Sequence, residues 1–125
     1  MKNMKFKGGD TIPVGTIVYK KVHATDALGR HINVVLTMIA TKPGICTFNP
    51  WGQKCRVAEA LVIKAETTSG RPVTSTTFDS PLYRGKKYKL YSKYTPDKFD
   101  SNTYDMCSNG VNCFLTKTLA RNFNF

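Results

Sequence analysis

The sequence has no long apolar run, since its uninterrupted apolar stretches are only a few residues long. A membrane-spanning helix needs about 20 apolar residues, so the sequence excludes one. Residues 1–10 carry positive charge but are not followed by an apolar stretch, and we therefore expect no secretory signal. These absences predict a soluble protein without a membrane partner.

Acidic residues are scarce: 8 Asp+Glu stand against 19 Lys+Arg, which leaves a formal net charge of +11 on 125 residues. Like charges on so small a surface repel one another and reduce stability. Such an excess usually accompanies affinity for a polyanion or a phosphorylated ligand, and solubility is the simpler explanation. Lysine outnumbers arginine 14 to 5. Because arginine makes most of the specific base contacts, this ratio favours general phosphate attraction over readout of DNA sequence.

Residues that bind metals or cofactors are few and unsuitably spaced. The cysteines form two pairs with eight and five intervening residues, whereas structural zinc ligands usually lie two to four residues apart. The four are Cys46, Cys55, Cys107 and Cys113. We expect no metal site and mostly packed, unpaired thiols, as in an intracellular protein. Neither a G-x-G-x-x-G nor a Walker pattern occurs, and no cofactor is expected.

A catalytic set is equally hard to assemble. His23 and His31 are candidate bases, but no local pattern joins either of them to a cysteine nucleophile. Asp97, Asp100 and Asp105 lie in one polar segment, where two carboxylates could share acid–base work. A hydrated, turn-forming loop explains these aspartates better. The sequence therefore favours a protein that does not catalyse.

The length and the 41% hydrophobic content predict one compact domain, residues 1–125, with residues 1–10 mobile. β-branched and apolar segments predict strands, and Gly and Pro predict loops between them. The strands are expected at residues 16–22, 32–40, 55–66 and 73–78, with loops at 42–44 and 49–52. Residues 55–66 also suit a helix, but the flanking strands need a partner, which favours a strand. A helix is expected at residues 116–122, with Thr116 as its N-cap. The fold class is α+β: a mostly antiparallel sheet with one C-terminal helix packed on it.

The most distinctive segment lies between Arg84 and Lys98, where six cationic residues accompany a single acid, Asp97. Four tyrosines are interleaved with them from residue 83 onwards. Cations attract phosphate and aromatic rings stack on bases, so this mixture is typical of nucleotide or single-strand binding. An amphipathic edge strand has the same pattern. The candidate ligand contacts are Arg56, Arg84, Lys86, Lys87, Tyr88, Lys89, Tyr91 and Lys93.

Several segments resemble an uncharacterised domain family of bacteriophages and giant viruses that is sometimes attached to pentapeptide repeats. They are V-Y-K-K-V (18–22), G-Q-K-C-R-V-A-E-A-L-V (52–62), Y-R-G-K-K-Y (83–88) and C-S-N-G-V-N-C-F-L-T (107–116), followed by Ala120. The K-C-R-x-x-x-A and C-S-x-G-x-x-x-F-L-T elements are the more specific ones. The resemblance implies a viral origin and a compact α+β domain, but no established activity. The family has a histidine where this chain has Asn112, which favours binding or a structural role over catalysis.

These observations predict a small viral protein that binds and sequesters a phosphorylated ligand, such as a nucleotide immune signal, in the host cytoplasm. Binding to nucleic acid, or to an acidic host protein of a nucleic-acid-handling complex, is the first alternative. An enzyme acting on a nucleotide or an ADP-ribose-like substrate is the second. A homo-oligomer would concentrate the charge of several chains around one ligand.

Overall fold

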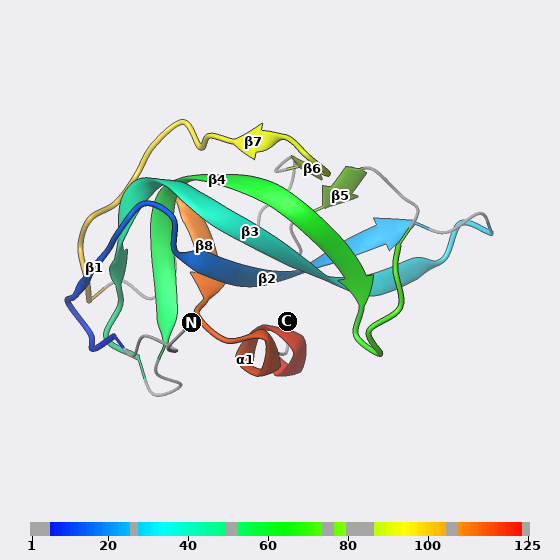
Figure 1. Cartoon of the computed structure of the whole chain (residues 1–125), viewed down its shortest axis with the longest axis horizontal. Coiled ribbons are helices and arrows are strands. Elements are labelled where there is room, and N and C mark those ends of the chain that lie inside the picture. The colour runs from blue at the N-terminus through cyan, green and yellow to red at the C-terminus, as the bar shows by residue number, and fades with distance from the viewer. Residues whose placement is uncertain are drawn as a thin grey trace.

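The computed structural model describes residues 6–25, 28–49, 53–73, 77–79, 87–104 and 108–123. In these residues the chain forms eight strands in one antiparallel sheet and one short helix, which confirms the β-rich α+β fold class (Figure 1). The elements are β1 (Thr11–Ile12), β2 (Ile17–Thr25), β3 (His31–Cys46), β4 (Lys54–Thr67), β5 (Thr77–Asp79), β6 (Lys87–Lys89), β7 (Lys93–Tyr94), β8 (Val111–Phe114) and α1 (Lys117–Asn122).

Four of the strands close into a ring. β2 pairs with β3, β3 with β4, β4 with β8, and β8 returns to β2 at the pair Tyr19↔Phe114. Closure of this kind removes exposed strand edges. β5 and β6 continue the sheet from β2, while β7 pairs with β4. Figure 1 shows β5, β6 and β7 on one side of the curved sheet and α1 on the other.

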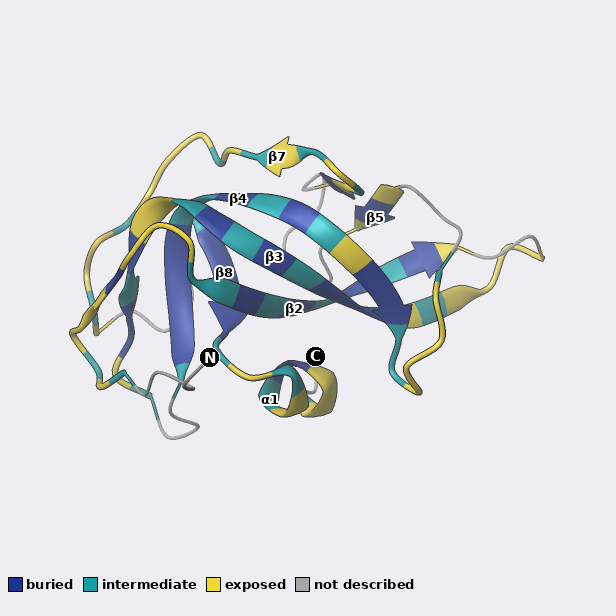
Figure 2. Cartoon of the chain, viewed as in Figure 1, coloured by how far each residue is buried: buried dark blue, intermediate teal, exposed yellow. Residues whose placement is uncertain are grey.

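β2 alternates between buried and partly exposed residues, as a strand with one face on the core must, whereas β3 and β4 also contain runs of three and four buried residues (Figure 2). On β2 the inward residues include Val18 and Val22, and on β3 they include Leu36 and Met38. Burying a side chain of this size contributes roughly 1.5–3 kcal/mol. The ring is therefore filled by apolar side chains.

β3 continues through residues 42–44, where the sequence predicts a loop. That prediction is wrong because β3 has bulges between Thr37 and Met38 and between Ala40 and Lys42, which bend the strand without ending it. Gly44 sits where β4 approaches so closely that a Cβ would collide with the Arg56 carbonyl. A glycine permits this approach.

The C-terminal helix begins where the sequence predicts. The Thr116 hydroxyl accepts a hydrogen bond from the Leu119 N–H at 3.3 Å, which confirms Thr116 as the N-cap of α1. Ala120 is buried in a small apolar cluster with Val35 and Phe114. α1 has six residues, and in the described parts of the chain no helix could cross a bilayer.

The other predicted elements have mixed outcomes. Residues 55–66 lie within β4, so the preference for a strand over a helix is confirmed. A strand is also expected at 73–78. β5 covers its last part, as Thr77–Asp79, while Val73 has no strand structure and residues 74–76 lie outside the described residues.

Hydrogen bonds join the first described residues to the sheet. The Gln53 side chain donates to the Phe6 carbonyl at 2.6 Å, and the Gly9 N–H donates to the Cys46 carbonyl at 2.7 Å.

Candidate functional site: a basic strap

The described part of the tyrosine–lysine segment, residues 87–94, crosses from β5 to β4, and we call it the basic strap. Its first part, β6, pairs with β5 through Phe78↔Tyr88. Its last part, β7, pairs with β4 through Leu61↔Lys93. Between the two, the Tyr91 N–H donates to the Val62 carbonyl at 2.8 Å, and the Val62 N–H donates to the Ser92 carbonyl at 3.1 Å. Backbone hydrogen bonds therefore fix both parts of the strap to the sheet.

The strap has a buried face and an exposed face. Tyr88 is 2% exposed and its ring stacks on Tyr94, with 4.3 Å between the ring centroids. Lys87 and Lys89 lie on either side of Tyr88 and are exposed. Tyr88 therefore faces away from the two lysines. Tyr88, a candidate ligand contact in the sequence, is instead a core residue whose ring has no free face for a base.

Tyr91 occupies the turn between β6 and β7 and is 75% exposed. Its φ of 62° places it in the left-handed region, which costs a residue other than glycine roughly 1 kcal/mol. The turn is held by the bond to Val62 and by a 3.1 Å bond from the Ser92 N–H to the Lys89 carbonyl. The strap thus presents one aromatic ring to solvent, between Lys89 and Lys93 in the sequence.

Acidic groups lie near only some of the strap lysines. Asp79 is the register partner of Lys87. Glu59 accepts hydrogen bonds from the hydroxyls of Thr95, at 2.5 Å, and Thr41, at 2.9 Å. These bonds, that of Thr95 first, lower the pKa of Glu59, and the cations of Lys42 and Lys93 lower it further. Glu59 therefore stays ionised near Lys93.

Lys89 differs from its two neighbours in the strap. None of the three forms an ion pair within the described residues, but the register partner of Lys89 is the uncharged Thr77, whereas Lys87 faces Asp79 and Lys93 lies near Glu59. The charge of Lys89 is therefore the least compensated of the three strap lysines. An approaching anion would meet this ammonium group beside the exposed Tyr91 turn.

Arg56 does not belong to this surface. Its side chain is 0% exposed, and its guanidinium donates to the carbonyls of Asp100, at 2.7 Å, and Asn102, at 2.8 Å. The stem of Arg56 packs under Gly110, where an added Cβ would lie 2.6 Å from the Arg56 Cγ. The predicted phosphate contact is thus a buried anchor for residues 99–104. The remaining candidates, Arg84 and Lys86, lie outside the described residues.

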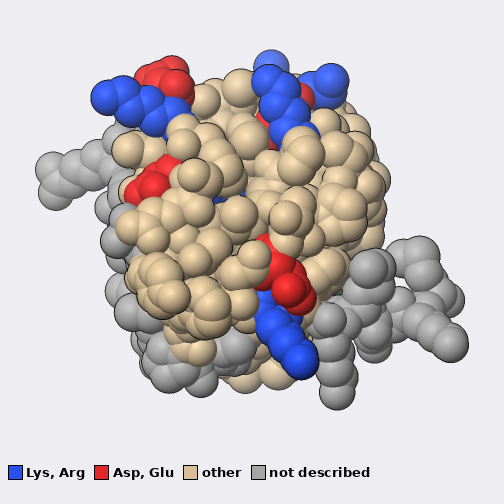
Figure 3. All heavy atoms as spheres, turned by 90° about the vertical axis from the view of Figure 1, so that its left-hand side faces the viewer, with Lys and Arg blue, Asp and Glu red and all other residues tan. Residues whose placement is uncertain are grey.

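The end of the molecule formed by β1 shows few charges. Figure 3 views this end, and its charged side chains lie mainly toward the margin of a largely uncharged surface. Phe48 and Tyr104 stack on each other with 4.9 Å between their ring centroids, and both are exposed. This end therefore carries charges of both signs scattered among other residues, unlike the exposed lysines of the strap.

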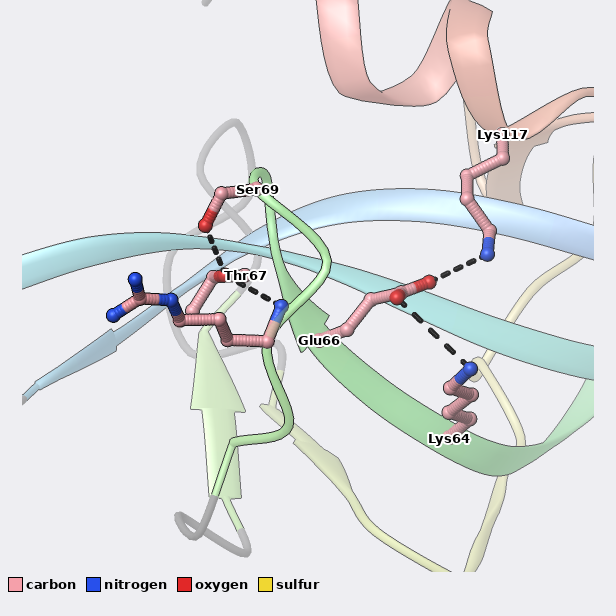
Figure 4. Close-up of polar contacts among 6 residues, drawn as sticks. Lys64, Glu66, Thr67, Ser69 and Lys117 are labelled. Carbon is pink, nitrogen blue, oxygen red and sulfur yellow. Dashed lines mark hydrogen bonds and ion pairs between the residues drawn. The ribbon is translucent and has the colours of Figure 1, made fainter.

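A second group of charges stabilises the fold (Figure 4). The Glu66 carboxylate is nearly buried and lies 2.6 Å from the Lys117 ammonium of α1 and 3.9 Å from that of Lys64. The hydrogen bond from Lys117, aided by the nearby cations, lowers the pKa of Glu66. Glu66 compensates one of these two positive charges, chiefly that of Lys117, and so ties α1 to β4.

Among the described residues, the candidate base His31 and the thiol of Cys46 do not come together. His31 begins β3 and Cys46 ends it, so a histidine base and this cysteine lie at opposite ends of the longest strand. The Asp100 carboxylate accepts a hydrogen bond from the Asn102 N–H at 2.8 Å, as in a turn-forming loop. In the described residues no three His, Cys, Asp or Glu side chains are grouped to hold a metal ion. Cys107 and Asp105 lie outside these residues.

The two most specific elements of the family resemblance meet in the sheet. Lys54, Cys55 and Arg56 pair with Phe114, Cys113 and Asn112 of β8. Cys55 is buried in the core and Gly110 covers Arg56, so both have structural roles. The Asn112 side chain donates to the Ser108 carbonyl at 2.8 Å.

The sequence alone does not predict the contacts of Arg56 with residues 99–104, because these contacts depend on the fold.

Fold and site together define a small β-rich α+β domain with a basic strap across one side of a closed sheet. Residues 3–120 match a protein family described as a family of unknown function (DUF5758), and the chain belongs to this family. No curated protein and no solved structure matches the chain.

Proposed function

We propose that the chain binds a phosphorylated small molecule at the basic strap and holds it without chemical change. The observation that carries the proposal is the exposure of Lys87, Lys89, Tyr91 and Lys93 on one fixed segment of eight residues. Ammonium groups attract phosphate, and an exposed tyrosine ring offers a face to a base.

The rigid mounting of the strap supports the proposal. Ligand affinity is reduced when a binding segment must first be ordered, and the hydrogen bonds between Val62 and the Tyr91 turn avoid this cost. The left-handed conformation of Tyr91 is consistent with a functional position, since strained residues often occur at ligand sites. Lys89 is the strongest single candidate for the phosphate contact.

The resemblance of the sequence to a viral domain family supports a more specific proposal. A small protein made in an infected cell can lower the concentration of a signalling nucleotide by binding it. We therefore propose that the ligand is a host nucleotide signal and that the protein acts in the host cytoplasm.

The separation of His31 from Cys46 supports binding over catalysis.

Isothermal titration with a panel of cyclic and linear nucleotides tests the proposal. We expect saturable binding of at least one nucleotide, and an affinity loss of about tenfold for each of the variants Lys89→Gln and Lys93→Gln, which corresponds to about 1.4 kcal/mol per phosphate contact. Arg121→Gln removes one exposed charge from α1, on the other side of the sheet, and should leave the affinity unchanged (Figure 1). A folded protein that binds no nucleotide would overturn the proposal.

Two further measurements separate the alternatives. A nucleic-acid-binding protein would bind an oligonucleotide more tightly than any mononucleotide, and its affinity would fall steeply between about 50 and 200 mM salt. An enzyme would return an altered compound when the complex is denatured and the released ligand is analysed by chromatography. Recovery of the unchanged nucleotide is the result that we expect.

A further inference from the structure

Three cysteines lie in a row across neighbouring strands of the ring. Cys46 of β3 is the register partner of Cys55 of β4, and Cys55 is the register partner of Cys113 of β8. All three are free thiols and each is at most 1% exposed. The Sγ atoms of Cys55 and Cys113 are 3.0 Å apart. The ring therefore brings together two thiols that are 58 positions apart in the sequence.

The strand geometry suits a covalent bond between them. A disulfide usually requires Cα atoms about 4.4–6.8 Å apart, and directly opposed residues of antiparallel strands lie about 4.5–5.5 Å apart. We propose that Cys55 and Cys113 are a disulfide-forming pair, oxidised by exchange with a low-molecular-weight disulfide such as oxidised glutathione. The bond would hold β8 to β4.

The reaction balances as two successive exchanges. The Cys113 thiolate attacks the external disulfide, forms a mixed disulfide and releases one thiolate. The Cys55 thiolate then attacks the Cys113 Sγ, forms the internal disulfide and releases the second thiolate. The two cysteines lose two electrons to the external disulfide, and the two protons that they give up end on the two released thiols.

The closed ring protects the thiols, so oxidation requires local opening. Burial raises the pKa of Cys55 well above its ordinary value, and the thiolate is the reactive form. Of the three strands that carry these cysteines, β8 is the most suited to open, because it has only four residues and pairs with β4 over those four and with β2 at a single position. Opening of β8 exposes Cys113 to the oxidant, and closing it returns Cys113 to Cys55.

The structure favours Cys113 over Cys46 as the partner of Cys55. Both thiols approach a backbone carbonyl at 3.4 Å, Cys46 that of Lys54 and Cys113 that of Val111, but the Cys113 Sγ also lies 3.0 Å from that of Cys55. Cys46 also lies on β3, which is paired along its length with β4. β3 therefore has less freedom to open than β8.

Peptide mapping of the intact chain tests this assignment. The protein is incubated with oxidised glutathione in mild urea, quenched with acid, unfolded, alkylated and digested. We expect a cross-linked Cys55–Cys113 peptide pair lacking two hydrogens, with Cys46 alkylated. Cys46→Ala, a matched buried control, should keep the cross-link, and Cys113→Ala should abolish it. Alkylation of both Cys55 and Cys113, or a cross-link to Cys46 or Cys107, would overturn the proposal.

A second readout uses the natural sequence alone and does not depend on variants that fold. The urea midpoint of the oxidised chain should exceed that of the reduced chain, and a reductant should restore the lower value. Equal midpoints would contradict a bond that joins the paired strands. Both tests are independent of ligand binding at the basic strap.

Discussion

Replacement of Arg56 by methionine is the sharpest test of the corrected role of this residue. Arg56→Met keeps an apolar stem under Gly110 and removes the guanidinium that donates to the carbonyls of Asp100 and Asn102. A hydrogen bond from a charged donor contributes roughly 1.5–3 kcal/mol. Because Asn102 is exposed, its carbonyl can regain a hydrogen bond to water in the variant. We therefore use the lower end of the range, about 1.5 kcal/mol for each bond. The two bonds then predict a loss of about 3 kcal/mol.

Urea denaturation measures this loss, and amide hydrogen exchange locates it. We expect a lower unfolding midpoint with an unchanged m-value, together with faster exchange in residues 99–104. Arg121→Met, on the exposed face of α1, should change the unfolding free energy by no more than about 0.5 kcal/mol. If Arg56→Met costs less than about 1 kcal/mol, the guanidinium is not the anchor of this segment. Nucleotide affinity should remain unchanged in the folded variant.

Three further predictions follow from the backbone and the charges. Gly110→Ala should destabilise the protein by about 1–3 kcal/mol in urea denaturation, since φ is +138° and the new Cβ meets the Arg56 stem; a neutral effect would contradict this packing. Tyr91→Gly should raise the unfolding free energy by up to about 1 kcal/mol by relieving the left-handed conformation, yet weaken nucleotide binding in titration; unchanged binding would show that the ring is not used. Glu66→Gln should cost about 0.5–1 kcal/mol at pH 7, because the side chains of its partners Lys117 and Lys64 are 42% and 59% exposed to screening solvent. The lowered pKa of Glu66 means that this stabilisation is present above its ordinary value of 4.5 and is lost as the pH falls through the lowered value. Urea midpoints from pH 7 downward should therefore converge for the natural chain and Glu66→Gln, and a gap that widens in acid would refute the ion pair.

Local patterns in the sequence were sufficient for several elements. The β-branched residues at 16–22 identify most of β2, and Thr116 identifies the start of α1, because both signals act within a few residues. The Lys87, Tyr88 and Lys89 pattern is that of an amphipathic edge strand, and its two lysines face outward while Tyr88 is buried.

Features that depend on tertiary contacts could not be predicted in this way. β3 passes through residues 42–44 because bulges and the approach of β4 override the local loop signal. Arg56 has the chemistry of a surface residue, and only its contacts with residues 99–104 explain its burial. The spacing of Cys55 and Cys113 gives no indication that β4 and β8 are neighbours, which requires the strand register.

Chemical-shift mapping of the isotopically labelled protein tests the central claim most directly. A nucleotide that binds in titration is added stepwise while the backbone amides are followed by NMR. We predict saturable shifts centred on residues 87–94, and loss of these shifts in Lys89→Gln but not in Arg121→Gln. Shifts centred on α1 or on the end near Phe48, with the strap unchanged, would contradict the account.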